Sequence, residues 1–224
     1  MSDQALLPTL YRCGFARHEN SLLQMFRARA PGFHDKVPDR EKTDQWLFLA
    51  RHAGLPTRLL DWSESALVGL HFALREEQKQ AVVWMLNPLQ LNYFAAGTPT
   101  NFDPENEREF PIPWHKPDPP NINIAYENLC GAWEHDGAGV SLPVAVHPTY
   151  VHSRLHGQRG CFTIHGKTKE GLNRQVDPSI LKCYRLDPEY HKSMLKDLMV
   201  LGVTYSVAFP DLGGLASELK VRFS

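Results

Sequence analysis

A short stretch in the N-terminal half of the chain concentrates side chains that bind anions, donate hydrogen bonds or move protons. These residues are Arg51, His52, Thr57, Arg58, Asp61, Trp62 and Ser63. Such groups, gathered within thirteen positions at the ends of predicted helices and strands, are typical of a binding or catalytic site. The alternative is structural: Arg58 and Asp61 pair with each other, and Trp62 belongs to the hydrophobic core.

The elements predicted around this stretch place its polar residues at a sharp corner. Apolar residues recur at a helical period over residues 46–53, which predicts a helix there. Gly54 suits a left-handed cap, and Pro56 prevents the helix from continuing. Residues 57–62 are too few for a helix and suit a short buried strand. A second helix follows, with Asp61 as its expected N-cap.

The rest of the chain predicts a mixture of strands and helices without strict alternation. We expect further strands at residues 10–15, 81–86, 142–147, 161–165, 180–186 and 203–209. We expect further helices at residues 19–30, 123–133 and 187–202 and from 212 onward, with a polar turn at 151–160. A proline-rich surface excursion covers about residues 98–120. The pattern indicates an α+β fold: one domain over residues 1–224, with a mixed or antiparallel central sheet flanked by helices.

Composition argues against several classes of protein. The chain has 24 basic and 25 acidic residues, which disfavours a general nucleic-acid binder and a membrane-surface protein. No signal peptide is recognised at the start, and no apolar run approaches the roughly 20 residues that cross a bilayer. The four cysteines are scattered, so we expect a cytoplasmic location and no metal. His152 and His156 have helical spacing, but no Glu follows His152 as in a metalloprotease motif.

Four motifs give the chain a resemblance to the FRG-domain family, which is named for an aromatic–Arg–Gly motif. Tyr11 and Arg12 correspond to the aromatic–Arg pair, although Cys13 stands at the third position and Gly14 follows it. The family's central block is similar to residues 46–74. The matching positions there are His52, Gly54, Pro56, Thr57, Arg58, Asp61 and Trp62, while Arg51 stands where the family more often has Gln. Residues 158–162 and 209–211 resemble its Gln-x-Gly-x-Phe and Phe-Pro-Asp motifs.

The resemblance implies both a fold and a reaction. The family's pattern is similar to that of ADP-ribosyltransferases, with an Arg on a first strand, a central strand followed by a helix, and a polar residue opening a later strand. This implies an ADP-ribosyltransferase-like fold and an enzyme that consumes NAD, transferring ADP-ribose to a macromolecular acceptor such as a protein or nucleic acid. Members occur in bacterial and phage toxin or defence settings, so an antitoxin or other partner protein is also implied.

The resemblance also gives each matched residue an expected role. Arg12 carries forked donors that suit a clamp on the diphosphate or ribose of NAD. Gln158 would hold the ribose hydroxyls, and His52 would contact the substrate or move a proton. The residues expected to line the nicotinamide slot are Tyr11, Thr57 and Ser63, and the further expected ligand contacts are Arg58, Asp61 and Trp62.

Gln158 stands where ADP-ribosyltransferases usually carry a Glu. A Gln amide cannot supply negative charge to an oxocarbenium-like transition state or act as a base. The carboxylate would then be Glu19, Asp61 or Glu64, and Glu19 is favoured because it opens the helix after Arg12. The alternative function is a non-catalytic module that binds a nucleotide, RNA or a protein. The enzyme hypothesis predicts that Arg12, Asp61 and Gln158 border one cleft.

Overall fold

The computed structural model describes residues 5–75, 80–95, 142–148, 153–166 and 168–223, which form helices and two small antiparallel sheets. The first sheet has the order β1–β4–β3, from Leu59–Ser63, Gly160–Ile164 and Val144–Val146. The second sheet pairs β2 (Ala81–Leu86) with β5 (Leu181–Leu186). The α+β class is confirmed. The strands do not form one central sheet, because among the described strands β2 pairs with β5 alone.

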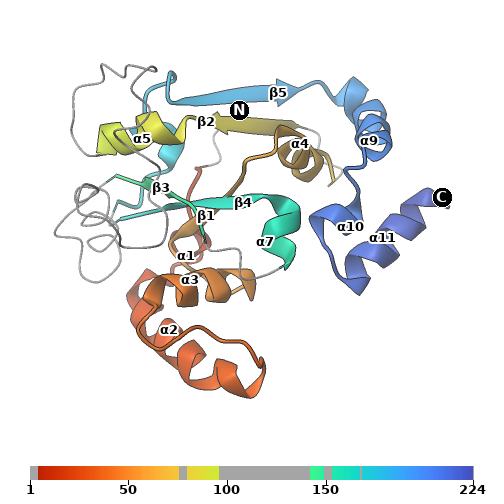
Figure 1. Cartoon of the computed structure of the whole chain (residues 1–224). Coiled ribbons are helices and arrows are strands. Elements are labelled where there is room, and N and C mark those ends of the chain that lie inside the picture. Colours follow the sequence, from red (N-terminus) through yellow and green to blue (C-terminus); the bar gives the residue numbers. More distant parts are fainter. Residues whose placement is uncertain (1–4, 76–79, 96–141, 149–152, 167, 224) are drawn as a thin grey trace.

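Figure 1 shows these elements stacked in layers, with the β2–β5 sheet at the top and the β1–β4–β3 sheet beneath it. Below the β1–β4–β3 sheet lie α3 (Thr43–His52) and α2 (Glu19–Arg29). Phe48 of α3 stacks on Phe162 of β4, with ring centroids 5.4 Å apart. Trp46, also on α3, meets Phe26 of α2 edge to face at 6.3 Å. The two faces of α3 therefore hold the sheet and the N-terminal helix together.

Between the two sheets lies a separate hydrophobic cluster. Its buried members are Leu91, Ala145, Leu172, Ile180 and Leu181. Trp62 of β1 and Trp84 of β2 pack against this cluster from the two sheets. Burial of apolar surface, at roughly 25 cal/mol per Å², is thus the interaction that holds the two sheets against each other.

Helices at one end of the molecule flank the second sheet. In that region α4 (Ala66–Leu74) packs on β2 and α9 (His191–Val200) packs on α4, in a cluster that includes Val68, Ala81 and Leu198. The chain then forms α10 (Tyr205–Ala208) and α11 (Leu212–Arg222), and α7 (Ser153–Gln158) contacts α10. The remaining short elements are α1 (Thr9–Arg12), η1 (Ala16–His18), η2 (Ala30–Gly32), α5 (Pro88–Ala95), α8 (Leu172–Gln175) and η4 (Pro188–Tyr190).

Several local predictions are confirmed. Strands occur where residues 57–62, 81–86 and 180–186 predicted them, within two residues at each end. Gly54 has a φ of +87°, the left-handed geometry expected at the end of α3. Asp187 caps the helical segment that follows β5, since its Oδ1 accepts a hydrogen bond of 3.0 Å from the Glu189 backbone N–H. These features depend on a few neighbouring residues, so the sequence determines them locally.

Four predictions are wrong. Residues 10–15 form no strand, because the helical turn α1 begins directly after Pro8, whose fixed φ suits a helix start. Residues 203–209 contain α10, in which the Phe209 N–H donates to the Tyr205 oxygen at 2.7 Å. Residues 151–160 contain α7 in place of a polar turn. Asp61 lies inside β1, and Ser65 caps α4 by accepting a hydrogen bond from the Val68 N–H. The predicted excursion at 98–120 and helix at 123–133 lie outside the described residues.

Candidate functional site

A cleft of about 1210 Å³ lies between the two sheets and is bounded by α4 and α7. The residues from the sequence-based site that line it are Arg51, His52, Asp61, Trp62, Ser63 and Gln158. Glu64 lines it as well, as do Arg75, Trp84, His147, Arg154 and Phe209. Arg12 is not among the lining residues, so of the three groups expected to border one cleft, Asp61 and Gln158 do so and Arg12 does not.

Ser63 and Gln158 meet at one end of the first sheet. The Ser63 hydroxyl donates to the Gln158 backbone oxygen at 2.7 Å, and the Glu64 N–H donates to the Arg159 oxygen at 3.0 Å. Arg159 adopts a φ of 46°, an uncommon geometry for a residue other than Gly, as the chain turns from α7 into β4. The Gln158 carboxamide donates through Nε2 to the Ala208 oxygen at 2.8 Å. Three segments far apart in sequence are therefore fastened at this corner.

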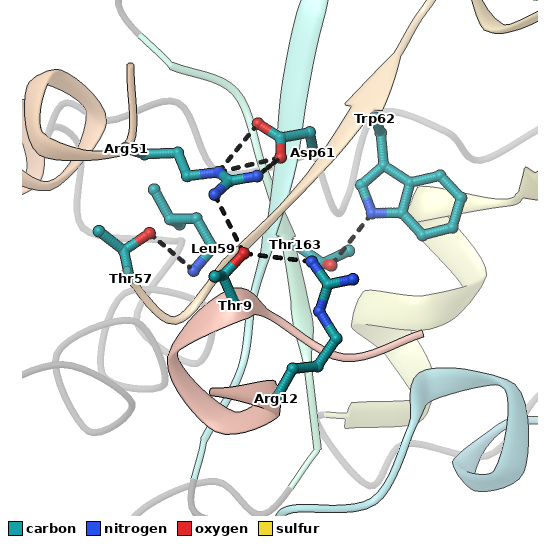
Figure 2. A network of polar contacts seen from close by, with 8 residues as sticks. All are labelled: Thr9, Arg12, Arg51, Thr57, Leu59, Asp61, Trp62 and Thr163. Carbon is teal, nitrogen blue, oxygen red and sulfur yellow. Dashed lines mark hydrogen bonds and ion pairs between the residues drawn. The ribbon is translucent and has the colours of Figure 1, made fainter. Parts of the chain in front are cut away.

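Figure 2 shows a polar network on the α3 side of β1. Arg51 donates to both carboxylate oxygens of Asp61, from Nε at 2.9 and 3.2 Å and through a further short contact. Arg51 also donates to the Thr9 hydroxyl at 3.3 Å, and the exposed Arg12 donates to the same oxygen at 3.2 Å. The suggested pairing of Arg58 with Asp61 is wrong. Side chains three positions apart on a strand point to opposite faces, so Asp61 meets Arg51 on α3 instead.

Arg58 pairs with Glu19 in a half-buried ion pair that joins α2 to the segment before β1. The Arg58 Nε donates to Glu19 Oε1 at 2.7 Å, with a second short contact to Oε2, and the two side chains are only 17% and 15% exposed. Burial disfavours the charged form of Arg58, but the hydrogen bond and charge of Glu19 outweigh it and raise the pKa of Arg58. Neither residue lines the cleft.

Tyr11 and Thr57 also lie away from the cleft lining. The Tyr11 hydroxyl donates to the Gly166 oxygen at 2.6 Å, and its pKa is raised by burial, against the opposing charge of nearby Arg58. Thr57 is 3% exposed, and its backbone oxygen accepts a hydrogen bond from the Leu10 N–H at 3.3 Å. Together with the Glu19–Arg58 pair, these contacts attach the N-terminal helices to the first sheet.

Glu64 presents a carboxylate to the cleft directly after β1. It is 44% exposed, and its Oε1 lies 3.5 Å from Nδ1 of His147, which is 12% exposed. Burial, and then the charge of Glu64, raise the pKa of Cys161 to about 12, so this thiol stays protonated and is a poor nucleophile. The cleft therefore contains a carboxylate beside a histidine at the point where β1 leads into α4.

Trp62 is both a wall of the cleft and part of a buried polar chain. Its Nε1 donates to the Thr163 hydroxyl at 3.1 Å, as Figure 2 shows, and that hydroxyl lies 3.1 Å from Nε2 of His165. The donor and acceptor roles between the Thr163 hydroxyl and Nε2 of His165 depend on the tautomer of the ring, because a hydroxyl can both donate and accept. Burial lowers the pKa of His165 to about 3, so the ring stays neutral.

Two arginines that carried no motif lie at the far end of the cleft. The Arg154 guanidinium carbon lies 4.4 Å from the Phe209 ring centroid, and that of Arg75 lies 5.2 Å from the same centroid. Arg75 also lies 5.4 Å from the Phe72 centroid, and the two rings meet edge to face at 5.6 Å. Phe209 belongs to the Phe-Pro-Asp motif, which was the one sequence feature that pointed to this region.

The described residues contain no group of three or more His, Cys, Asp or Glu side chains placed to hold a metal ion. None of the helices in the described part of the chain combines the length and apolar character that crossing a bilayer requires.

The fold and the cleft define an α+β protein with an open site large enough for a small-molecule ligand. Comparison with known families matches residues 1–81 to the FRG domain, so the resemblance to the FRG-domain family is confirmed over this part of the chain. The match includes Tyr11, Arg12 and the central block up to β2, while the motifs at Gln158 and Phe209 lie beyond it. No curated protein and no solved structure is significantly similar to the chain.

Proposed function

We propose that the cleft binds NAD and that the protein transfers ADP-ribose from it to a macromolecular acceptor. The observation that carries the proposal is that residues 51–65 and 145–162, far apart in sequence, contribute hydroxyl, carboxylate, carboxamide and aromatic groups to one cleft. Its volume is slightly above the range of about 300–1,000 Å³ in which most ligand pockets fall, so a dinucleotide can be accommodated. Trp62 and Trp84 supply flat apolar walls for its rings.

The reaction breaks the bond between ribose C1′ and the nicotinamide nitrogen, and the electron pair leaves with neutral nicotinamide. A nucleophilic atom of the acceptor then forms a bond to C1′ and gives up its proton. A carboxylate beside C1′ stabilises the cationic transition state and can accept that proton. Glu64 is the candidate we favour, because it lines the cleft and its carboxylate lies 3.5 Å from Nδ1 of His147. His147 is then a positioning residue.

The structure changes which carboxylate we favour as the catalytic group, from Glu19 to Glu64. Glu19 was favoured from the sequence, but its carboxylate is engaged by Arg58 outside the cleft lining. Asp61 does line the cleft, yet its two oxygens accept hydrogen bonds from Arg51. Gln158 keeps its proposed role at the ribose, where its carboxamide oxygen would accept from a sugar hydroxyl. An acceptor of protein or nucleic acid and a toxin or defence role belong to the same proposal and rest on the family resemblance. A cytoplasmic location also belongs to it and rests on the four scattered cysteines.

Release of nicotinamide from NAD tests this function. Purified protein is incubated with NAD and with cell extract as a source of acceptors, and nicotinamide is quantified by chromatography. Changing Glu64→Gln should lower kcat/KM by about 100-fold or more, the usual contribution of a positioned acid–base group. Glu189→Gln is the matched control, because Glu189 is an exposed carboxylate in η4 outside the cleft lining. A wild-type protein that releases no nicotinamide refutes the proposal, and equal rates for both variants remove Glu64 from it.

The second candidate is a non-catalytic module that binds a nucleotide in the same cleft. A specific observation favours it, because two of the polar groups chosen from the sequence are engaged by the protein itself: Asp61 by Arg51 and the Gln158 amide by Ala208. Calorimetric titration with NAD separates the two functions. Saturable binding without nicotinamide release supports the module, and binding with release supports the enzyme.

A further inference from the structure

The Phe209 end of the cleft brings together two cationic side chains from separate helical segments. Arg154 lies on α7, before β4, whereas Arg75 directly follows α4, and both line the cleft. Both guanidinium carbons lie within 5.2 Å of the Phe209 ring centroid, so the two guanidinium groups are neighbours around one ring. Both side chains are half-buried. The fold therefore concentrates positive charge at one end of an otherwise mixed site.

The aromatic rings determine how the two guanidinium groups are presented. A guanidinium over an aromatic ring is attracted to the ring through its positive charge, while its N–H donors lie at the edge of the guanidinium plane. Phe209 contacts both arginines, and Phe72 adds a second ring against Arg75. Holding these long side chains before a ligand arrives reduces the conformational entropy lost on binding. The arrangement suits a planar, forked interaction with phosphate oxygens.

We propose that Arg75 and Arg154 form the subsite that binds the diphosphate of a nucleotide ligand in the cleft. This inference rests on the proposed function for the identity of that ligand as a dinucleotide. Each guanidinium takes one of the two phosphates. The diphosphate therefore lies at the Phe209 end, and the sugar that reacts extends along the cleft toward Glu64 and Ser63. The sequence assigned the clamp on the diphosphate to Arg12. Because Arg12 does not line the cleft, Arg75 and Arg154 take this role instead.

Binding of diphosphate compounds tests the subsite separately from catalysis. Inorganic pyrophosphate, ADP-ribose and adenosine are titrated into the wild-type protein by calorimetry, since adenosine lacks the group that the subsite recognises. We expect saturable binding of ADP-ribose that weakens as salt is raised. Changing Arg154→Gln or Arg75→Gln should each weaken ADP-ribose binding by about 10- to 100-fold, as expected for the loss of hydrogen bonds to a charged group.

Two further variants provide controls. Arg159→Gln removes one positive charge from the neighbouring exposed turn, outside the cleft lining, and should leave the affinity for ADP-ribose unchanged. Arg154→Lys keeps the charge but loses the fork, so its affinity should lie between those of the wild type and Arg154→Gln. If Arg154→Gln fails to fold, as circular dichroism and thermal melting will show, Arg154→Lys still tests the role of the forked donors.

Several outcomes overturn the subsite. These are no binding of ADP-ribose or pyrophosphate by the wild type, unchanged affinity in both Gln variants, and an equal loss in Arg159→Gln. A loss confined to Arg12→Gln also overturns it, because the clamp then lies at the other end. ADP-ribose binding that depends on Arg75 and Arg154 without any nicotinamide release supports the subsite while the proposed transferase function fails.

Discussion

Replacing Glu19 by Gln should destabilise the protein strongly, because it removes one charge from a half-buried ion pair. Glu19 and Arg58 are 15% and 17% exposed, so neither is well solvated once its partner is lost. Breaking a buried pair costs about 3–5 kcal/mol, and we expect about 3 kcal/mol here because part of each side chain still reaches solvent. For a chain of this size, that corresponds to a fall in Tm of about 6–12 °C.

Asp61→Asn is the matched control for this experiment. Asp61 also pairs with an arginine, but its side chain is 53% exposed, so its loss should cost less than about 1 kcal/mol. Urea unfolding followed by circular dichroism gives both free energies of unfolding. The double change Glu19→Leu with Arg58→Met should recover most of the loss, because it leaves no unpaired charge.

The reasoning fails if Glu19→Gln and Asp61→Asn lower the free energy of unfolding equally. It also fails if Glu19→Gln abolishes nicotinamide release by a protein that remains as stable as the wild type. In that case the carboxylate would act in the chemistry, and its pairing with Arg58 would not be its main role.

Three further predictions concern buried groups and a close backbone contact. The pKa of His165 falls from 6.5 to about 3 on folding, so below pH 6.5 the unfolded state binds a proton that the folded state does not. The free energy of unfolding should therefore decrease as pH falls from 6.5 toward 3, by up to ~1.4 kcal/mol per pH unit. Urea unfolding at several pH values measures this dependence, and His165→Gln should make the free energy of unfolding depend less steeply on pH. Gly157→Ala would place a Cβ 2.5 Å from a backbone oxygen of α10 and should cost about 1–3 kcal/mol in thermal melts, whereas Gly32→Ala, in open space, should cost much less. Cys161, with its raised pKa, should react with iodoacetamide far more slowly than the exposed Cys13, as mass spectrometry will report.

Features set by neighbouring residues were predictable from the sequence. The continuous apolar run at 81–86 forms β2, the Gly54–Pro56 pair ends α3, and Asp187 caps the segment after β5. In each case the determining interaction spans only a few positions. The strand predictions for residues 10–15 and 203–209 were wrong because a run of six or seven mixed residues fits a short strand and a single helical turn equally well.

The composition of the site depended on contacts between distant segments. Arg58 is nearer to Asp61 in the sequence than Arg51 is, yet Arg51 is its partner, because the direction of side chains along β1 decides between them. Strand alternation could have excluded Arg58, since it stands an odd number of positions from Asp61. Nothing local marks Arg75 or Arg154 as cleft residues, because their common neighbour Phe209 is more than 50 positions from either.

The two walls of the cleft belong to sheets that share no ladder hydrogen bond among the described strands. Their spacing is therefore set by hydrocarbon contacts, including those of Trp62 and Trp84 with the cluster between the sheets. Such contacts are individually weak and have no preferred direction, so a small sliding of one sheet over the other breaks no backbone pairing. A molecule that touches both walls would favour one spacing over the others, and substitutions deep in that cluster would then alter affinity without touching the ligand.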